Sequence, residues 1–153
     1  NRVSPLMKVV SLRFSRIVGL HYSGVKPVGF FARVIEALVN DREIVIQNPE
    51  NKINLLDIND SVRAIIYIIN NTDWNYLPKI LNVGNENISI GSYCDKVVNM
   101  LGDMNKARLI QKGTTQEVTL TSMLDSSAFI KLGWKPLCSI DDIIRQMISS
   151  YRS

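Results

Sequence analysis

The stretch that decides the fold reads INLLDINDSVRAIIYIIN over residues 53–70. Its first six residues are mostly aliphatic, which predicts a short strand over Ile53–Ile58. Asp60 then opens a helix, because Asn59 or Asp60 can accept a hydrogen bond from a free first-turn N–H group. The helical spacing of the apolar residues predicts one buried face, formed by Val62, Ile65, Ile66 and Ile69. A strand that runs directly into a helix indicates an α/β protein.

Upstream of this unit, the sequence predicts a strand, a loop, a helix and another strand. Lys8–Phe14 is a β-branched run, and a long loop follows over Ser15–Pro27. A helix of about three turns then begins near Phe31, where apolar residues share one face. Glu43–Ile46 is a further strand, and a polar turn at residues 48–51 separates it from the strand at residue 53. The two strands either form a hairpin or belong to different sheets.

Downstream, a buried strand is followed by a well-delimited helix. Lys79–Val83 predicts the strand, which ends at a glycine. Ser89 is a typical N-cap for the next helix, and Gly102 stands where that helix should stop. The apolar stripe between them includes Cys94, which we therefore expect in the core.

The last third of the chain completes the α/β pattern. Residues 107–110 and, more weakly, 117–121 are strand candidates. A helix begins near Asp125 and ends at Gly133, which can adopt the left-handed conformation of a helix cap. The final helix spans Ser139–Tyr151 with a single apolar face. The sequence thus predicts one domain over residues 1–153, with mixed short strands and about five helices.

Composition excludes several functional classes. The chain has 153 residues, 46% of them hydrophobic, which suffices for a buried core. Its net charge of +4 arises from scattered Lys and Arg residues rather than a basic cluster, so we expect no nucleic-acid partner. Nor do we expect a membrane partner, because no apolar stretch approaches the roughly 20 residues of a bilayer span. Cys94 and Cys138 lack metal-ligand spacing, which predicts a reduced, cytoplasmic protein without a metal site.

Motifs that would carry catalysis fail in this sequence. The eight glycines include no GxGxxG or GxxGxxG spacing, which a dinucleotide pyrophosphate requires. Tyr22 and Lys26 have the YxxxK spacing of a tyrosine base, but Gly24 and Pro27 disfavour the helix that this pair needs. His21 is the only histidine, and no serine lies in a GxSxG elbow. We therefore predict no catalytic residue in this chain.

Four short runs nevertheless share the order and spacing of one enzyme family. LRFSRIVG at residues 12–19 is similar to the family's LRxxNxxG, and INLLDINDSVRA at 53–64 to its RDFIHVDDVARA. NVG at 82–84, followed by ISI at 88–90, resembles its NVG and SI pair. LDSS at 124–127 with LGWKP at 132–136 is similar to its LDxSKAxxxLGWxP ending. Together these runs resemble the carboxyl-terminal half of the extended short-chain dehydrogenase/reductase family, the NAD-dependent nucleotide-sugar epimerases and dehydratases.

The resemblance implies that the chain is the substrate-binding portion of a longer polypeptide whose Rossmann nucleotide-binding part is absent. In the intact enzyme, NAD or NADP accepts a hydride from the sugar while a tyrosine of a Tyr/Lys pair takes a hydroxyl proton. Both the main cofactor site and that pair belong to the missing part, so we expect this fragment alone to be inactive. The implied partners are a nucleotide-diphosphate sugar, the chain's own amino-terminal Rossmann part and, for the intact protein, a second copy in a homodimer.

The resemblance also assigns site residues. Arg16 replaces an asparagine near the substrate diphosphate, Phe30 lies in the segment that reaches the base, and Ile46 stands where a side chain packs on the base. The expected substrate-binding residues are Arg16, His21, Phe30, Ile46 and Lys52. The expected cofactor-binding residues, where the first strand ends and the chain turns toward nicotinamide, are Ser15, Arg16 and Ile17.

Two positions depart from the family pattern. One phosphate-clamping arginine falls on Ile53, beside Lys52, and the second falls near Thr115, with only Lys112 close by. An apolar chain cannot replace a bidentate guanidinium, and lysine supplies only a point charge. We hypothesise that Arg16 compensates in part. The alternative function is a non-catalytic binding or regulatory module that retains the fold, and a third interpretation is a free-standing α/β domain with unrelated chemistry.

Overall fold

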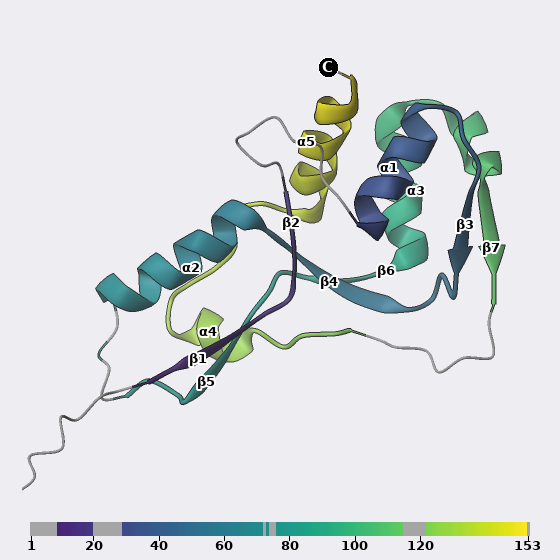
Figure 1. Ribbon diagram of the computed structural model, residues 1–153. Coiled ribbons are helices and arrows are strands. Elements are labelled where there is room, and N and C mark those ends of the chain that lie inside the picture. Colours follow the sequence, from purple (N-terminus) through teal and green to yellow (C-terminus); the bar gives the residue numbers. More distant parts are fainter. Residues whose placement is uncertain (1–8, 20–28, 72, 74–75, 115–121, 153) are drawn as a thin grey trace, which may run out of the picture.

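The computed structural model describes residues 9–19, 29–71, 73, 76–114 and 122–152 and shows an α/β arrangement of short strands and helices (Figure 1). In chain order the elements are β1 (Ser11–Phe14), β2 (Arg16–Val18), α1 (Phe30–Val39), β3 (Ile44–Gln47), β4 (Lys52–Asp57), α2 (Ile58–Asn71), β5 (Ile80–Val83), β6 (Asn87–Ser89), α3 (Ile90–Leu101), the 3₁₀ helix η1 (Met104–Leu109), β7 (Ile110–Gly113), α4 (Ser127–Lys131) and α5 (Ile140–Arg152).

Strand β4 contributes side chains to both hydrophobic cores of the structure. It pairs in parallel with β2 on one edge and antiparallel with β6 on the other. Successive side chains of a strand point to opposite faces of the sheet. Leu55 is accordingly fully buried in one core, and its neighbour Leu56 is fully buried in the other. The continuous apolar run of this strand reflects burial on both faces.

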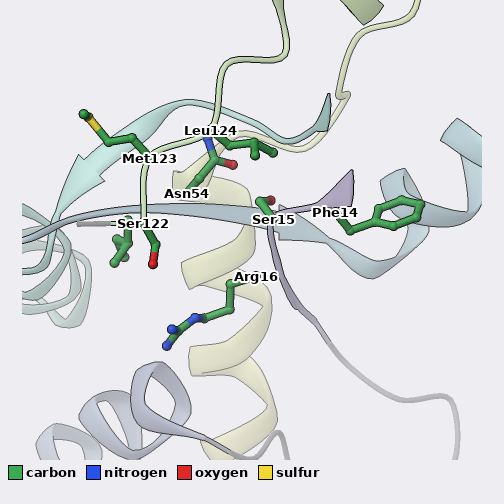
Figure 2. Close-up of a pocket in the computed structure, with 8 residues that line it drawn as sticks. Phe14, Ser15, Arg16, Asn54, Ser122, Met123 and Leu124 are labelled. Atoms are coloured by element: carbon green, nitrogen blue, oxygen red, sulfur yellow. The ribbon is translucent and has the colours of Figure 1, made fainter. Parts of the chain in front are cut away.

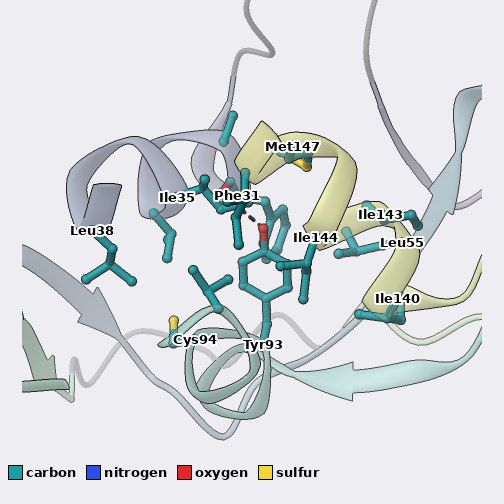
Figure 3. Packing of buried hydrophobic residues seen from close by; sticks show 14 of the residues in the cluster. Phe31, Ile35, Leu38, Leu55, Tyr93, Cys94, Ile140, Ile143, Ile144 and Met147 are labelled. Atoms are coloured by element: carbon teal, nitrogen blue, oxygen red, sulfur yellow. Dashed lines mark hydrogen bonds between the residues drawn. The ribbon is translucent and has the colours of Figure 1, made fainter. Parts of the chain in front are cut away.

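The larger core lies between α1, α3 and α5 and the β4 face that carries Leu55 (Figure 3). Phe31 and Tyr93 meet edge to face at its centre, with ring centroids 4.9 Å apart. The Tyr93 hydroxyl donates a hydrogen bond to the Phe31 carbonyl over 3.1 Å, so the buried phenol is satisfied. Burial raises the pKa of Tyr93 far above its ordinary value, and the side chain therefore serves as a neutral packing group.

The smaller core joins α2 and α4 to the parallel pair β1–β5. Phe129 of α4 stacks on Trp134, with ring centroids 4.8 Å apart. Tyr67 of α2 packs against Phe129 and donates its hydroxyl to the Leu132 carbonyl over 2.6 Å. These contacts explain the LGWKP run: Trp134 fills the core, while Gly133 adopts a φ of 98° to end the helical turn.

The carboxylate of Asp60 ties the start of α2 to the segment that leads into α5. Asp60 is 1% exposed and accepts hydrogen bonds from the backbone N–H groups of Leu137 and Cys138, at 3.0 and 2.9 Å. Arg63 supplies a charged partner on the same carboxylate. The predicted capping role falls instead on Asp57, whose Oδ1 accepts from the Asn59 N–H over 2.8 Å. The helix begins at Ile58, so Asp57 precedes its first turn and Asp60 is free for a long-range contact.

The predicted buried face of α2 is wrong. Val62, Ile65, Ile66 and Ile69 are between 44% and 62% exposed. The helix packs through a different stripe, in which Ala64 and Ile68 are buried. Because α2 carries apolar residues on two faces, periodicity predicted a buried helix face but could not identify which face meets the sheet. The strands closest to α2 are β4 and β2.

Most other elements agree with the predictions. Ser89 caps α3 by accepting from the Ser92 N–H over 3.0 Å, Gly102 adopts a φ of 74° at its end, and Cys94 is fully buried. The strands near residues 44 and 53 belong to different sheets, since β3 pairs with β7. Two predictions are wrong: β2 interrupts the expected loop after residue 15, and η1 replaces the strand at 107–110, with β7 beginning at Ile110. The strand candidate at 117–121 lies outside the described residues.

Within the described parts of the chain, none of the helices combines the length and the apolarity needed to cross a bilayer. No three His, Cys, Asp or Glu side chains gather there in a way that could hold a metal ion.

We expect Asp60→Ala to lower the free energy of unfolding by about 2–4 kcal/mol, because two part-buried N–H groups lose their acceptor. Urea unfolding followed by circular dichroism measures this change. The matched control is Asp95→Ala on the exposed side of α3, for which the change should stay within about 0.5 kcal/mol. Equal values for the two variants would contradict the role assigned to Asp60.

Burial raises the pKa of the Cys94 thiol to about 12, and the neighbouring Asp95 carboxylate adds to the shift. We expect Ellman's reagent near pH 8 to label Cys94 of the Cys138→Ser variant at least about 100-fold faster in denaturing urea than in buffer.

Since the unfolded thiol ionises at a lower pH than the folded one, the stability that Cys94 contributes should fall as pH rises from about 9 toward 12. Similar labelling rates by Ellman's reagent in urea and in buffer would show that Cys94 is accessible in the folded chain and would contradict its burial.

Candidate functional site

A cavity of about 470 Å³ opens where β1 ends and β2 begins (Figure 2). Strand β6 pairs with one edge of β4. On the other edge, Ser122 pairs with Ile53 and Arg16 of β2 pairs with Leu55. Between these two partners, the edge of β4 is open at Asn54. The residues that line the cavity are Phe14, Ser15, Arg16, Ile53, Asn54, Ser122, Met123 and Leu124.

Ser15 lies at the point where the chain leaves one sheet for another. Its N–H group continues the β1–β5 ladder by donating to the Val83 carbonyl over 2.9 Å, and the next residue, Arg16, already pairs with β4. The Ser15 Oγ is buried and has no hydrogen-bond partner among the described residues. Ligands of parallel α/β sheets bind beyond the carboxyl ends of strands at such switch points. The unpartnered hydroxyl can therefore serve a ligand group.

Arg16 supplies the positive charge of the site. Its side chain is exposed, and its guanidinium lies 5.3 Å from the centre of the Phe31 ring, in the first turn of α1. A cation over an aromatic face gains about 0.5–1 kcal/mol at an exposed position, which helps to hold Arg16 in place. No ion pair joins Arg16 to a carboxylate in the described parts of the chain, so the guanidinium remains available to an anion.

The amino terminus of α1 adds to this positive potential. Gly29 precedes the helix with a φ of 102°, its position as N-cap provides no capping side chain, and the first turn contains no acidic residue. Free N–H groups and the helix dipole favour negative charge at such an end. Because Phe31 belongs to this turn and lies beneath Arg16, both positive features face the same region.

Asn54 holds the walls of the cavity together from its position in β4. The side chain is 1% exposed; its Nδ2 donates to the Asn85 carbonyl over 2.7 Å and to Asn87 Oδ1 over 2.9 Å. Its Oδ1 accepts from the Asn85 N–H over 2.9 Å. Asn87 in turn accepts from the Leu124 N–H over 3.1 Å. One buried amide thus fixes β6 and the 122–124 segment around the cavity.

Gly84 has a specific steric role beside this network. A Cβ atom at position 84 would lie 2.5 Å from Asn54 Oδ1 and 3.0 Å from the Leu124 Cδ2. Both distances are shorter than a van der Waals contact permits. The glycine of the NVG run is therefore required for the close approach of Asn54, and not for an unusual backbone conformation.

The structure brings only some of the predicted site residues together. Ser15 and Arg16 line the cavity, and Ile53 lines it where the resemblance predicts an arginine. Ile17 follows in β2 and is 45% exposed. Phe30 begins α1 beside Phe31, with ring centroids 5.1 Å apart, close to the region that Arg16 covers.

Two further predicted residues, Lys52 and Ile46, do not line the cavity. Lys52 is exposed at the start of β4, where its carbonyl accepts from the Ser122 N–H over 2.9 Å. Ile46 is fully buried in the larger core and does not line the cavity. His21 and Thr115 lie outside the described residues, as do Tyr22 and Lys26.

Sequence reasoning missed most of the cavity wall. Asn54 carried a usable signal, because a polar residue inside an apolar strand must find hydrogen-bond partners when buried. Ser122, Met123 and Leu124 carried none: they reach β4 through a parallel bridge between residues 69 positions apart, Ile53 and Ser122. Such a contact depends on tertiary topology and not on local sequence.

Comparison with known proteins yields matches in structure. No family model matches this sequence, and no curated protein matches it. A UDP-glucose 4-epimerase from Thermotoga maritima, solved with UDP-glucose, superposes with a TM-score of 0.73 at 18% identity, covering 92% of this chain and 45% of its own. A dTDP-glucose 4,6-dehydratase from Bacillus anthracis, in complex with NAD, gives a TM-score of 0.73 at 14% identity, covering 94% and 44%.

A UDP-glucuronic acid 4-epimerase from Bacillus cereus, bound to UDP-glucuronic acid and NAD, gives a TM-score of 0.73 at 19% identity and covers 95% of this chain and 46% of its own. This chain has the fold of the carboxyl-terminal part of nucleotide-sugar epimerases and dehydratases. The predicted fold class and the resemblance carried by the four runs are confirmed in structure. The chain spans less than half the length of each of these enzymes.

We expect Gly84→Ala to lower the free energy of unfolding by about 1–3 kcal/mol, because the added methyl group overlaps Asn54. Urea unfolding of Gly84→Ala, Asn54→Ala and the double variant measures the coupling between the two positions. The cost of Gly84→Ala should be clearly smaller when Asn54 is already alanine, since the overlapping amide is gone. Additive costs would contradict a direct clash.

Proposed function

We propose that this chain is the substrate-binding lobe of an NAD(P)-dependent nucleotide-sugar epimerase or dehydratase. The observation that carries the proposal is the cavity where the chain passes from β1 to β2. Among the described residues, the Ser15 hydroxyl at this opening has no hydrogen-bond partner and the Arg16 guanidinium forms no ion pair. The fold, common to several enzymes solved with nucleotide sugars or NAD, supports it. The activity belongs to an intact isomerase or oxidoreductase of the cytoplasm, and this lobe alone is inactive.

Arg16 is the proposed ligand of the substrate diphosphate. A guanidinium binds phosphate oxygens through charge-assisted hydrogen bonds, and the uncapped amino terminus of α1 favours the same charge. Phe30, at the start of that helix, is half-buried and offers an aromatic edge to the base. Lys52 lies in β4 next to Ile53, which lines the cavity, and adds a second positive charge outside the lining.

The nicotinamide cofactor is held mainly by the part of the enzyme that precedes this lobe. When bound, NAD or NADP accepts and returns a hydride at the sugar carbon. From this chain, Ser15, Arg16 and Ile17 are the proposed cofactor contacts. The buried, unpartnered Ser15 Oγ fits this role because a polar group without a partner is costly unless a ligand satisfies it. The proton-transferring Tyr/Lys pair is likewise proposed to come from the preceding part.

The second candidate function is a non-catalytic nucleotide-binding module with the same fold. Ile53 favours it, because this apolar side chain is 5% exposed at a position where the resemblance calls for a phosphate-clamping arginine. A module of this kind would bind a nucleotide but would lack the glycine-rich loop and the Tyr/Lys pair upstream. The sequence that precedes Asn1 therefore discriminates between the two functions.

Calorimetric titration of the 153-residue chain with UDP-glucose, dTDP-glucose and UDP-glucuronic acid tests diphosphate-sugar binding. We expect at least one of them to bind, and Arg16→Ala to weaken that binding about 10- to 100-fold, as loss of a charge-assisted contact should. The matched control is Arg33→Ala, an exposed arginine of α1 that does not line the cavity.

Binding that is equally strong in Arg16→Ala and in the unchanged chain would remove Arg16 from the site. Heat signals for none of the three sugars would count against the substrate class. Glucose and inorganic pyrophosphate serve as separate controls, since binding of pyrophosphate alone would indicate an anion site without sugar recognition.

A further inference from the structure

The cavity beside β4 has its charge and much of its apolar surface on different sides. Figure 2 shows Arg16 on one side of β4 and Met123 and Leu124 on the other. Ile53 of β4 also lines the cavity and is 5% exposed. Among the described residues of the lining, Arg16 carries the one charge, and none is a carboxylate. We call Ile53, Met123 and Leu124 the apolar wall.

Backbone hydrogen bonds hold the apolar wall in place. The Ser122 N–H group donates to the Lys52 carbonyl over 2.9 Å, next to the bridge between Ser122 and Ile53. The Leu124 N–H group donates to Asn87 Oδ1 over 3.1 Å, and the Leu124 carbonyl accepts from Asn87 Nδ2 over 3.3 Å. The wall is therefore a preformed surface, and both backbone polar groups of Leu124 are already engaged.

This part of the cavity offers few hydrogen-bond partners to a ligand. A side-chain amide has two N–H donors. Asn54 uses both of them, on the Asn85 carbonyl and on Asn87 Oδ1, and its own Oδ1 accepts from the Asn85 N–H group. The side chains of the apolar wall have no hydroxyl, amide or charged group. A ligand hydroxyl buried against the wall therefore loses its bonds to water without replacement, which is costly.

The sugar is the part of the proposed ligand that meets this wall. In a nucleotide sugar the diphosphate lies between the base and the sugar. With the base at Phe30 and the diphosphate at Arg16, the sugar extends from Arg16 away from Phe30 and into the cavity. Its volume of about 470 Å³ lies within the range of small-molecule sites and has room for a hexose. The exocyclic C6 group projects beyond the hexose ring, so a wall contacts it directly.

We propose that the site selects a 6-deoxyhexose, whose C6 methyl group packs against the apolar wall, over a hexose with a hydroxyl group at C6. This inference rests on the proposed function, since it names the sugar that a nucleotide-sugar site takes. The wall acts on specificity alone. Arg16 holds the diphosphate of either ligand, whereas only the methyl group gains from burial against Ile53, Met123 and Leu124.

Calorimetric titration of the 153-residue chain with dTDP-glucose and dTDP-6-deoxyglucose, which differ by one oxygen atom, tests the preference. We expect the deoxysugar to bind about 10- to 100-fold more tightly, the range over which an apolar site rejects an added hydroxyl group. Met123→Gln introduces an amide at a side chain that is 56% exposed, so the fold should tolerate it. The preference should fall below about 3-fold in this variant, because the amide can bond to the C6 hydroxyl.

The control variant is Met104→Gln, at a methionine of η1 that is 67% exposed and does not line the cavity. It should keep the preference of the unchanged chain. Equal binding of the two sugars by the unchanged chain, or a full preference that persists in Met123→Gln, would overturn this inference and leave the proposed function standing. Binding of neither sugar would overturn the proposed function and this inference with it.

Discussion

The fold depends on the junction between β4 and α2, where two buried carboxylates accept hydrogen bonds from the backbone, one within the junction and one from a distant segment. Asp57 closes the first turn of α2, and Asp60 reaches across the chain to the backbone at Leu137 and Cys138. Through that contact the helix of the smaller core is tied to α5, which belongs to the larger core. A carboxylate that satisfies two backbone donors at once is well suited to such a connection, because water competes poorly at a buried site.

The functional site follows from the same arrangement. Strand β1 belongs to the sheet of the smaller core and β2 pairs with β4, so the chain must change sheets at Ser15. That change leaves a gap beside β4, and hydrogen bonds from Asn54 hold the segments at Asn85 and Asn87 in place beside it. Arg16 enters the gap held over Phe31, a residue of the larger core. Ile53 of the larger core and Phe14 beside the smaller core both line the cavity. The positions of the polar side chains Ser15 and Asn54 follow from the course of the backbone.

Sequence reasoning predicted the elements better than their contacts. Helix α3 was delimited correctly because Ser89 and Gly102 act within one turn of the chain, and α5 because its single apolar face left no ambiguity. The orientation of α2 was wrong because two of its faces are apolar, and only packing decides between them. The LRFSRIVG run pointed to Ser15 and Arg16, which line the cavity, and their binding roles stay predictions. Residues 122–124 could not be found, since their place beside β4 depends on a contact between distant segments.

The alternation of Leu55 and Leu56 between the two cores limits which sequence changes β4 can accept during evolution. A substitution in this strand alters the volume of one core only, and neighbouring side chains can adjust. An insertion or deletion of one residue would instead exchange the faces of everything beyond it, sending polar Asn54 or Asp57 into positions now filled by leucine. Related chains should therefore differ in the side chains of β4 while keeping its length, and should accumulate their length differences in the connections around it.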